Sequence, residues 1–179
     1  MIIRKAVESD ILKIANINIA AVPNGSRAKW GINLTAKFFE SYFFEGGPFI
    51  VAEEEETLIG YVMGFYRGST ARAEFDRWRG IEPISINNEN HFPLREYDCV
   101  LLSLAVSPDH TGCGVAKKLV FAFLEFIRFN GKVQNTCVET QTSNIAAQHV
   151  YQDCGYQEIA RDNNSVWYEL RFSGDRHNE

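Results

Sequence analysis

The spacing of apolar side chains follows two different periods along the first part of the chain. Residues 2–6 are a short strand candidate. Residues 8–21 then repeat isoleucine and alanine close to helical spacing, which predicts an amphipathic helix with Ser9 as its cap. A second helix, rich in aromatic side chains, is predicted from a cap near Asn33 to a stop at Gly46. The domain therefore opens with one strand and two helices.

The middle of the chain predicts a hairpin followed by an insertion. Residues 48–53 and 57–66 have the apolar pattern of two strands, and the glutamates at 53–56 between them are expected to form a solvated turn. Residues 67–95 are polar and rich in turn-forming residues, and four of the five arginines there, at positions 67, 72, 77 and 79, are interleaved with Phe75 and Trp78. We expect this stretch to be an insertion between strands.

The second half of the chain returns to regular strands and helices. Residues 97–106 form a nearly continuous apolar run, as expected for a strand buried on both faces. A glycine turn follows, and residues 115–129 then keep a helical period until an Asn-Gly pair. The remaining predicted elements are a strand at 133–141, a helix at 144–154, strands at 156–161 and 165–172, and a disordered tail at 173–179.

Composition and charge restrict the class of protein. With 45% hydrophobic residues, the 179-residue chain can bury the core of one domain without disulfides. It carries 18 Lys and Arg against 23 Asp and Glu, a net charge of −5, which argues against a nucleic-acid partner. No apolar run reaches the roughly 20 residues of a membrane helix, and early charges interrupt any secretory segment. We therefore expect a cytoplasmic protein with no membrane or nucleic-acid partner.

Cysteine and histidine give no sign of a metal site. The four cysteines are scattered singly, without a C-x-x-C pair, and the histidines lack the spacing of metal ligands. Free thiols in a reducing compartment and no bound metal are the expectation.

The segment PDHTGCGVAKKLV, residues 108–120, places Gly112 and Gly114 between the buried strand and the next helix. Backbone N–H groups at a helix start are unpaired and carry partial positive charge, so such a turn can bind a phosphate. Taken alone, the two glycines are better explained by a tight turn that binds nothing.

The wider sequence favours the phosphate-binding interpretation of the turn. The run LSLAVSPDHTGCGVAKKL, followed later by NIAAQHVYQDCGYQEI, resembles the GNAT superfamily of acetyl-CoA-dependent N-acetyltransferases, and the predicted order of elements is similar to that family's. The resemblance covers nearly the whole chain. It implies a single α/β (α+β) domain over residues 1–172, with a mixed, mostly antiparallel, twisted sheet of about six to seven strands flanked by about four helices.

The resemblance also implies how coenzyme A is held. The family's Q/R-x-x-G-x-G/A motif falls on residues 111–116, whose backbone N–H groups would bind the pyrophosphate, and residues 104–106 match the strand that pairs with the pantetheine arm. Thr111 stands where Gln or Arg is usual, which could weaken binding. The implied cofactor-binding residues are Leu104, Ala105, Val106, Thr111, Gly112, Cys113, Gly114, Val115, Ala116, Asn144 and Ala147.

A tyrosine on the later helix is the predicted catalytic residue. Asn144, either Ala147 or Gln148, and Tyr151 recur at spacings of three to four, so they lie along one helix face, which in the family looks onto the cofactor. A phenol, with an ordinary pKa of about 10, can protonate the departing thiolate, which makes Tyr151 the general acid. No carboxylate lies in CVLLSLA, residues 99–105, the apolar part of the strand before the turn. Either Glu96 or Asp98 acts through water, or solvent takes the proton of an amine of modest pKa.

The acceptor is less well defined. The family brings it in beside the first two helices and the hairpin, where aromatic faces suit a sugar ring or planar base, although Phe38 and Phe39 are better explained as core. Arginines of the insertion could bind a second phosphate, or pair with nearby carboxylates. The candidate substrate-binding residues are Trp30, Tyr42, Tyr66, Arg72 and Arg77.

The sequence therefore predicts an N-acetyltransferase that moves the acetyl group of acetyl-CoA to a primary amine of a small molecule, such as an amino sugar or a nucleotide-linked amino sugar. An acetyltransferase of protein N-termini or antibiotics would show the same motifs. A non-catalytic acyl-CoA-binding module is the alternative from another class, and retention of Tyr151 speaks against it. A homodimer through the insertion or the last strands is compatible with the sequence, which does not specify the oligomeric state.

Overall fold

The computed structural model describes residues 1–70, 97–129 and 133–172. Its α-helices are α1 (Ile11–Ala21), α2 (Ser26–Phe44), α4 (Val115–Phe129) and α5 (Ile145–Asp153), and single 3₁₀ turns occur at η1 (Glu8–Asp10) and η3 (Pro108–His110). Its strands are β1 (Ile2–Lys5), β2 (Phe49–Glu54), β3 (Thr57–Tyr66), β4 (Cys99–Val106), β5 (Asn135–Gln141), β6 (Gln157–Arg161) and β7 (Ser165–Arg171).

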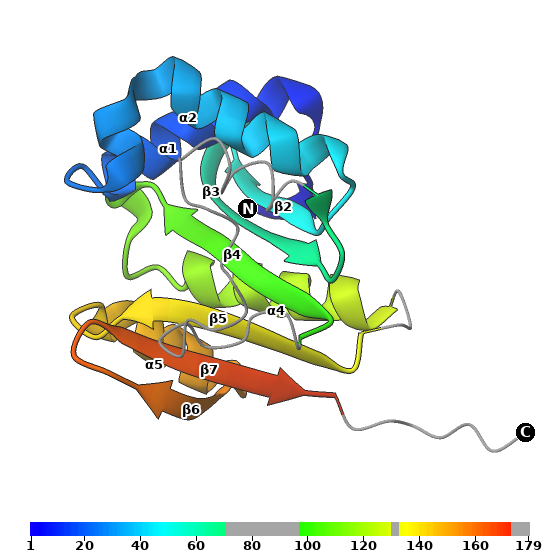
Figure 1. Cartoon of the computed structure of the whole chain (residues 1–179). Helices are drawn as coiled ribbons and strands as arrows, with labels where there is room; N and C mark the ends of the chain where they lie inside the picture. Colours follow the sequence, from blue (N-terminus) through cyan, green and yellow to red (C-terminus); the bar gives the residue numbers. More distant parts are fainter. Residues whose placement is uncertain (71–96, 130–132, 173–179) are drawn as a thin grey trace, which may run out of the picture.

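The described strands form one seven-stranded sheet in the order β1-β2-β3-β4-β5-β7-β6. Within it the pair β4–β5 is parallel and the other neighbouring pairs are antiparallel. The element order and the mixed, mostly antiparallel sheet confirm the predicted fold class, and Figure 1 shows the sheet with its helices.

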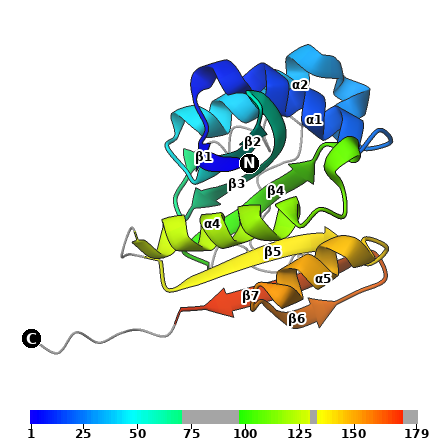
Figure 2. The same cartoon turned by 180° about the vertical axis from the view of Figure 1, so that it is seen from behind.

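Helices cover both faces of the sheet. The helices α1 and α2 pack on one face over an aromatic cluster that includes Phe38, Phe39 and Tyr61. The helices α4 and α5 pack on the other face, where Leu119 and Phe123 of α4 belong to a second apolar cluster. Both helices lie in front of the sheet in Figure 2. Phe38 and Phe39 are buried, which confirms that they belong to the core.

The second helix departs from its prediction. It begins at Ser26, well before Asn33, and it is broken at Gly31, where φ is 76°. This positive φ is tolerated at low cost by glycine, so a short first segment can change direction before the longer second one. The hydroxyl of Thr35 donates to the carbonyl oxygen of Arg27 at 2.8 Å and ties the two segments together.

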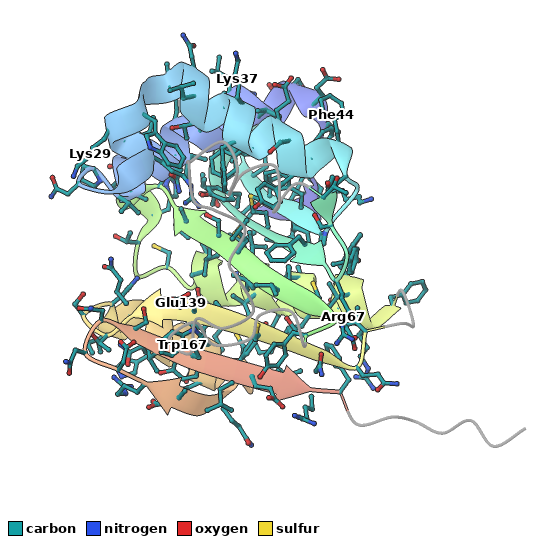
Figure 3. The ribbon with its side chains drawn as sticks, viewed as in Figure 1. Lys29, Lys37, Phe44, Arg67, Glu139 and Trp167 are labelled. Atoms are coloured by element: carbon teal, nitrogen blue, oxygen red, sulfur yellow. The ribbon has the colours of Figure 1, made fainter. Side chains whose placement is uncertain are left out.

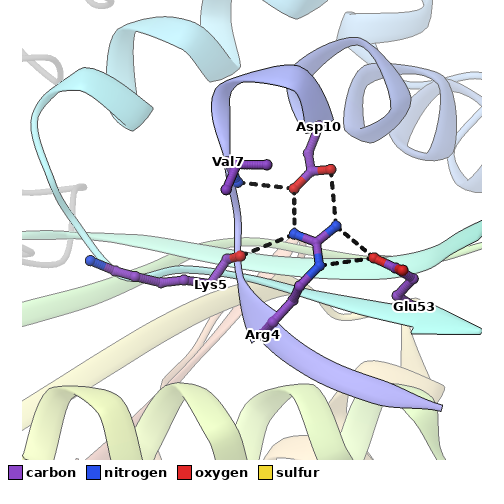
Figure 4. A network of polar contacts seen from close by, with 5 residues as sticks. All are labelled: Arg4, Lys5, Val7, Asp10 and Glu53. Atoms are coloured by element: carbon purple, nitrogen blue, oxygen red, sulfur yellow. Dashed lines mark hydrogen bonds and ion pairs between the residues drawn. The ribbon is translucent and has the colours of Figure 1, made fainter. Parts of the chain in front are cut away.

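The first helix and the hairpin are joined by a buried ion-pair network that the sequence did not predict (Figure 4). Asp10, and not Ser9, is the N-cap of α1, and its carboxylate accepts hydrogen bonds from Arg4 Nη1 at 2.7 Å and from the backbone N–H of Val7 at 2.9 Å. Arg4 also donates from Nε to Glu53 at 2.8 Å. Glu53 is therefore part of β2 and of this network, and it does not belong to a solvated turn.

Parts of the prediction fall outside the described residues. Of the insertion at 67–95 only residues 67–70 are described, so Arg72 and Arg77 are not placed, and the tail at 173–179 is not placed either. Across the described ranges, no helix combines the length and the apolarity needed to cross a bilayer. The same ranges contain no group of three or more His, Cys, Asp or Glu side chains suited to a metal ion.

Candidate functional site

The strand β4 separates from its neighbour β5 partway along its length. The two strands pair only through residues 99–101 of β4. On its other side β4 remains paired with β3, but the register skips Leu102, which is the extra residue of a β-bulge. A bulge bends its strand and increases the local twist. Figure 1 shows that β4 and β5 consequently diverge toward their carboxyl ends.

The divergence leaves an edge inside the sheet. In the part of the chain that the structure describes, no strand pairs with the β5-facing side of Leu104 to Val106. The side chains of Leu104 and Val106 pack against the apolar cluster under α4 and α5, whereas Ala105 faces the α1 and α2 side. Since backbone groups along this edge can pair with an extended ligand, the opening suits a narrow chain such as pantetheine.

The opening ends at the glycine turn. Gly112 and Gly114 have φ values of 78° and 75°, which L side chains rarely adopt. A Cβ at either position would meet no atom within 4 Å, so the surface of the turn is open. The first backbone bond into α4 runs from Lys118 N to Gly114 O at 3.2 Å, which leaves the preceding N–H groups at the helix start without an intrahelical acceptor. An open turn at a helix start fits a pyrophosphate group.

The two other polar side chains of the turn have local roles. Thr111 donates its hydroxyl to the carbonyl oxygen of Pro108 at 2.9 Å. Cys113 is exposed, and its thiol lies 3.8 Å from the carbonyl oxygen of Thr111. The hydroxyl of Thr111 thus stabilises the turn, and whether the missing Gln or Arg weakens coenzyme binding stays a prediction.

Tyr151 lies at the end of α5 that packs into the core. The residue is 4% exposed and belongs to the cluster that includes Leu101 of β4 and Val138 of β5. Its ring contacts those of Tyr156 and Tyr168, with centroids 5.9 Å and 6.1 Å away. Burial, with smaller contributions from neighbouring ionisable groups, raises the pKa of Tyr151. The phenol therefore keeps its proton at neutral pH.

The first turn of α5 is fixed by two amides with different roles. Asn144 is the N-cap, and its side-chain oxygen accepts from the N–H of Ala147 at 3.2 Å. Gln148 is buried, donates to the carbonyl oxygens of Gln141 and Thr142, and accepts from Arg161. These bonds hold α5 beside the end of β5. Gln148 is therefore a structural residue, and the sequence did not reveal that role.

A buried polar cluster lies on the opposite face of β4, beside the bulge. The hydroxyl of Tyr61 accepts from Asn18 Nδ2 at 2.6 Å and shares a hydrogen bond with Ser103 Oγ at 2.8 Å. Arg27 donates from Nη1 to Ser103 Oγ at 3.3 Å. The sequence signal for this cluster is weak, since it consists of single polar residues on otherwise apolar elements. Only the fold brings the four side chains together.

The predicted substrate-binding residues separate into two groups. Trp30 lies on the first segment of α2, with its ring centroid 6.2 Å from that of Phe38. Tyr42 and Tyr66 line a pocket of about 340 Å³ with Arg67 at the far end of β3, where Tyr66 pairs with Cys99. Figure 3 labels Lys29, which neighbours Trp30, and Arg67 on opposite sides of the molecule. Trp30 and Tyr42 nevertheless share a neighbour, because the ring centroid of Tyr42 lies 5.1 Å from that of Phe38, and binding of the acceptor by these residues stays a prediction.

Comparison with known proteins points to one family. A model of the acetyltransferase (GNAT) family matches residues 18–156. Human N-acetyltransferase 8B is 30% identical over 132 residues, which cover 73% of this chain and 48% of the relative. The L-amino acid N-acyltransferase MnaT of Escherichia coli K12 is 28% identical over 125 residues, or 69% of this chain and 58% of the relative. The chain thus spans about half the length of the curated relatives that it matches.

A solved structure has the same fold. The protein yncA of Salmonella typhimurium, determined with its cofactor acetyl-CoA, superposes with a TM-score of 0.69 at 18% identity, covering 100% of this chain and 98% of that one. At this identity the likeness establishes the architecture and does not by itself transfer a substrate.

Proposed function

Because the chain belongs to the acetyltransferase (GNAT) family, we propose that it transfers the acetyl group of acetyl-CoA to a primary amine of a small molecule. One observation carries the proposal. The opening between β4 and β5 starts at the Leu102 bulge and ends at an open glycine turn on the N-terminus of α4. Few ligands combine a narrow extended arm with a pyrophosphate, and coenzyme A does.

The residues that would hold acetyl-CoA follow from this geometry. The N–H groups of residues 112–116 bind the pyrophosphate, and the free edge of Leu104 to Val106 pairs with the pantetheine arm. Asn144 and Ala147, at the start of α5, are the contacts proposed for that helix. Acetyl-CoA supplies the activated acyl group, and a backbone N–H of β4 is the proposed stabiliser of the developing oxyanion.

Tyr151 is the proposed proton donor. The amine nitrogen forms a bond to the acetyl carbon, the carbon–sulfur bond breaks, and the thiolate takes the proton of the Tyr151 hydroxyl. The raised pKa keeps this hydroxyl protonated before the reaction. Among the described residues no hydrogen bond to another group fixes the direction of its O–H, which leaves this proton available for transfer. The amine loses its proton to solvent, and the Tyr151 phenolate, because its pKa is raised, takes a proton back from solvent.

The proposal is tested by thiol release from acetyl-CoA with a panel of amines. The panel contains L-amino acids, amino sugars, nucleotide-linked amino sugars, aminoglycosides and N-terminal peptides, and Tyr151→Phe is assayed beside the parent protein. We expect release with one class of amine and a loss of about 10²- to 10⁴-fold in kcat for the variant. Coenzyme A affinity should change little, because the phenol does not contact the pyrophosphate.

Two results would contradict this function. Tight acetyl-CoA binding without release from any amine would favour a non-catalytic acyl-CoA-binding module. Release that persists unchanged in Tyr151→Phe would leave an acetyltransferase whose general acid is another group. A cytoplasmic location and a homodimer stay predictions.

A further inference from the structure

A groove of about 830 Å³ lies between the strand β1 and the helix α4. β1 is the outermost strand of the described sheet, and β2 and β3 separate it from β4 and from the opening beside β4. Figure 2 shows β1 and α4 side by side. The apolar lining comes from Ile3 and Ile50 on the strands and from Ala122 and Phe126 on the helix. The groove is therefore a second apolar hollow, distinct from the coenzyme site.

An exposed aromatic ring stands at the end of this groove. Phe129 is the last residue of α4 and lines the groove, yet it is 95% exposed. Phe126, one turn earlier, is instead partly buried against the core. A single exposed apolar side chain is ordinary on a protein surface, but an apolar projection next to an apolar hollow is typical of an interaction surface. The same surface thus contains both halves of a packing contact.

The groove also carries one charge of each sign without an ion-pair partner. The Nζ of Lys5 lies 5.1 Å from the ring centroid of Phe126, and Figure 4 shows the Lys5 side chain directed away from the Arg4 network. Glu125 is exposed on α4 and lines the opposite side of the groove. Within the described ranges, neither Lys5 nor Glu125 forms an ion pair. The other two cations at the groove, Arg4 and Arg128, already have partners.

We propose that this groove is an interface between two copies of the chain, related by a two-fold axis that runs along the groove. Such an axis places β1 of each copy against α4 of the other. Phe129 then enters the groove of the partner subunit, and Lys5 faces Glu125 of the partner subunit. Each contact is made twice, as two-fold symmetry requires. The interface goes beyond acetyl transfer, and it differs from the insertion and the last strands, which the sequence suggested for a homodimer.

Charge selects this axis over the other symmetric arrangement. An axis across the groove would place β1 against β1 and α4 against α4, so that Lys5 would meet Lys5 and Glu125 would meet Glu125. Like charges brought together at an interface are unfavourable, whereas opposite charges determine the register of the two partners. A small ligand in the groove would leave the outer face of Phe129 in water, but a second copy covers it. The surface is thus complementary to itself in both shape and charge.

Sedimentation velocity of the full chain, at about 1 to 100 μM, measures the dimer dissociation constant. We expect the parent to form dimers in this range. Phe129→Ser, Lys5→Glu and Glu125→Lys should each raise the constant at least about tenfold, because each substitution is made twice in a symmetric dimer. Two matched controls should leave it unchanged. Phe44→Ser removes another exposed phenylalanine, and Lys118→Glu reverses an exposed charge elsewhere on α4.

Mixing the two charge variants tests the direction of the axis. In a dimer of Lys5→Glu alone, or of Glu125→Lys alone, both contacts join like charges. In a mixed dimer with one subunit of each variant, both contacts again join opposite charges. The mixture should therefore form dimers at concentrations at which each variant alone is monomeric. A substitution that acted through the fold of its own subunit would not be rescued in this way.

Three results would overturn the proposal. The first is a parent that stays monomeric at the highest concentration. The second is a dimer whose dissociation constant is unchanged by Phe129→Ser and by the charge variants, since its interface then lies elsewhere. The third is a mixture of the charge variants that stays monomeric. Urea unfolding midpoints establish that every variant is folded. None of these measurements uses thiol release, so they decide the interface whether or not the proposed reaction is found.

Discussion

Replacement of Arg4 by alanine should lower the free energy of unfolding, and this loss should become smaller as the pH falls. Arg4 holds Asp10 and Glu53 together across β1, β2 and the start of α1 (Figure 4). Asp10 is 2% exposed, and the Arg4 side chain is 33% exposed. Removing one partner of a buried ion pair typically costs about 3–5 kcal/mol, because the other charge stays buried. Since Arg4 is partly solvated, we take the lower end, about 3 kcal/mol at pH 7.

The sign follows from the pKa of Asp10 in the two proteins. Burial raises this pKa, but hydrogen bonds from Arg4 and the Val7 N–H, with the charge of Arg4, outweigh burial and lower it. The parent therefore gains stability from Asp10 above the unfolded pKa of about 3.9 and loses it as the pH falls through the lower folded value. Without Arg4, burial is no longer opposed by the guanidinium and the folded pKa rises above 3.9. The cost of the substitution then shrinks as the pH falls, by up to about 1.4 kcal/mol for each pH unit below that raised pKa.

Urea unfolding at pH 7.0, 6.0, 5.0 and 4.5 measures this cost for Arg4→Ala and for the double variant Arg4→Ala/Asp10→Asn. The double variant carries no buried charge at Asp10, so it should be at least as stable as the single variant at pH 7 and should differ from it less at pH 4.5. A cost below about 1 kcal/mol, or a difference between the two variants that does not change with pH, would refute the reasoning.

The remaining predictions concern two glycine substitutions and the stability at alkaline pH. A Cβ at Gly64 would lie 2.4 Å from the Val100 carbonyl oxygen and 2.7 Å from the Phe123 ring, so Gly64→Ala should cost about 3 kcal/mol or prevent folding. Gly112→Ala should lower the free energy of unfolding by only about 1–2 kcal/mol, because of the positive φ, but it should weaken acetyl-CoA binding. Urea unfolding measures the stability of both variants, and calorimetry measures their binding of acetyl-CoA. Unimpaired binding by Gly112→Ala would contradict the pyrophosphate site. Burial raises the pKa of Cys137 to about 12 and of Cys154 to about 11, and it also raises the pKa of Tyr61 and Tyr156. The unfolded chain releases these protons from about pH 8.5 upward, whereas the folded protein keeps them to higher pH. The free energy of unfolding should therefore fall between about pH 8.5 and 10.5. A free energy that stays constant over this range would contradict the raised pKa values.

Much of the architecture could be predicted because it rests on local signals. The period of apolar residues predicted the order of strands and helices, and the glycines at 46, 112, 114 and 155 predicted where turns follow or precede them. The glycine turn could be located for the same reason, since a positive φ and a helix start are properties of adjacent residues. The prediction failed locally at α2, where an apolar pattern starting at Asn33 concealed a helical segment before Gly31.

The candidate site depends on contacts between residues far apart in sequence. The β4–β5 pairing ends next to the Leu102 bulge, where one skipped residue reverses which face of the sheet the following side chains occupy. Arg27 meets Ser103 across 76 positions of the chain, and Arg4 meets Glu53 across 49. A single charged or hydroxyl residue has no period and no fixed spacing to its partner, so its sequence context looks the same whether it is solvated or buried. The sequence by itself therefore determined the elements and the position of the glycine turn, whereas the tertiary structure decided which polar groups lie beside the opening, because only the packing of helices on a bent strand brings them together.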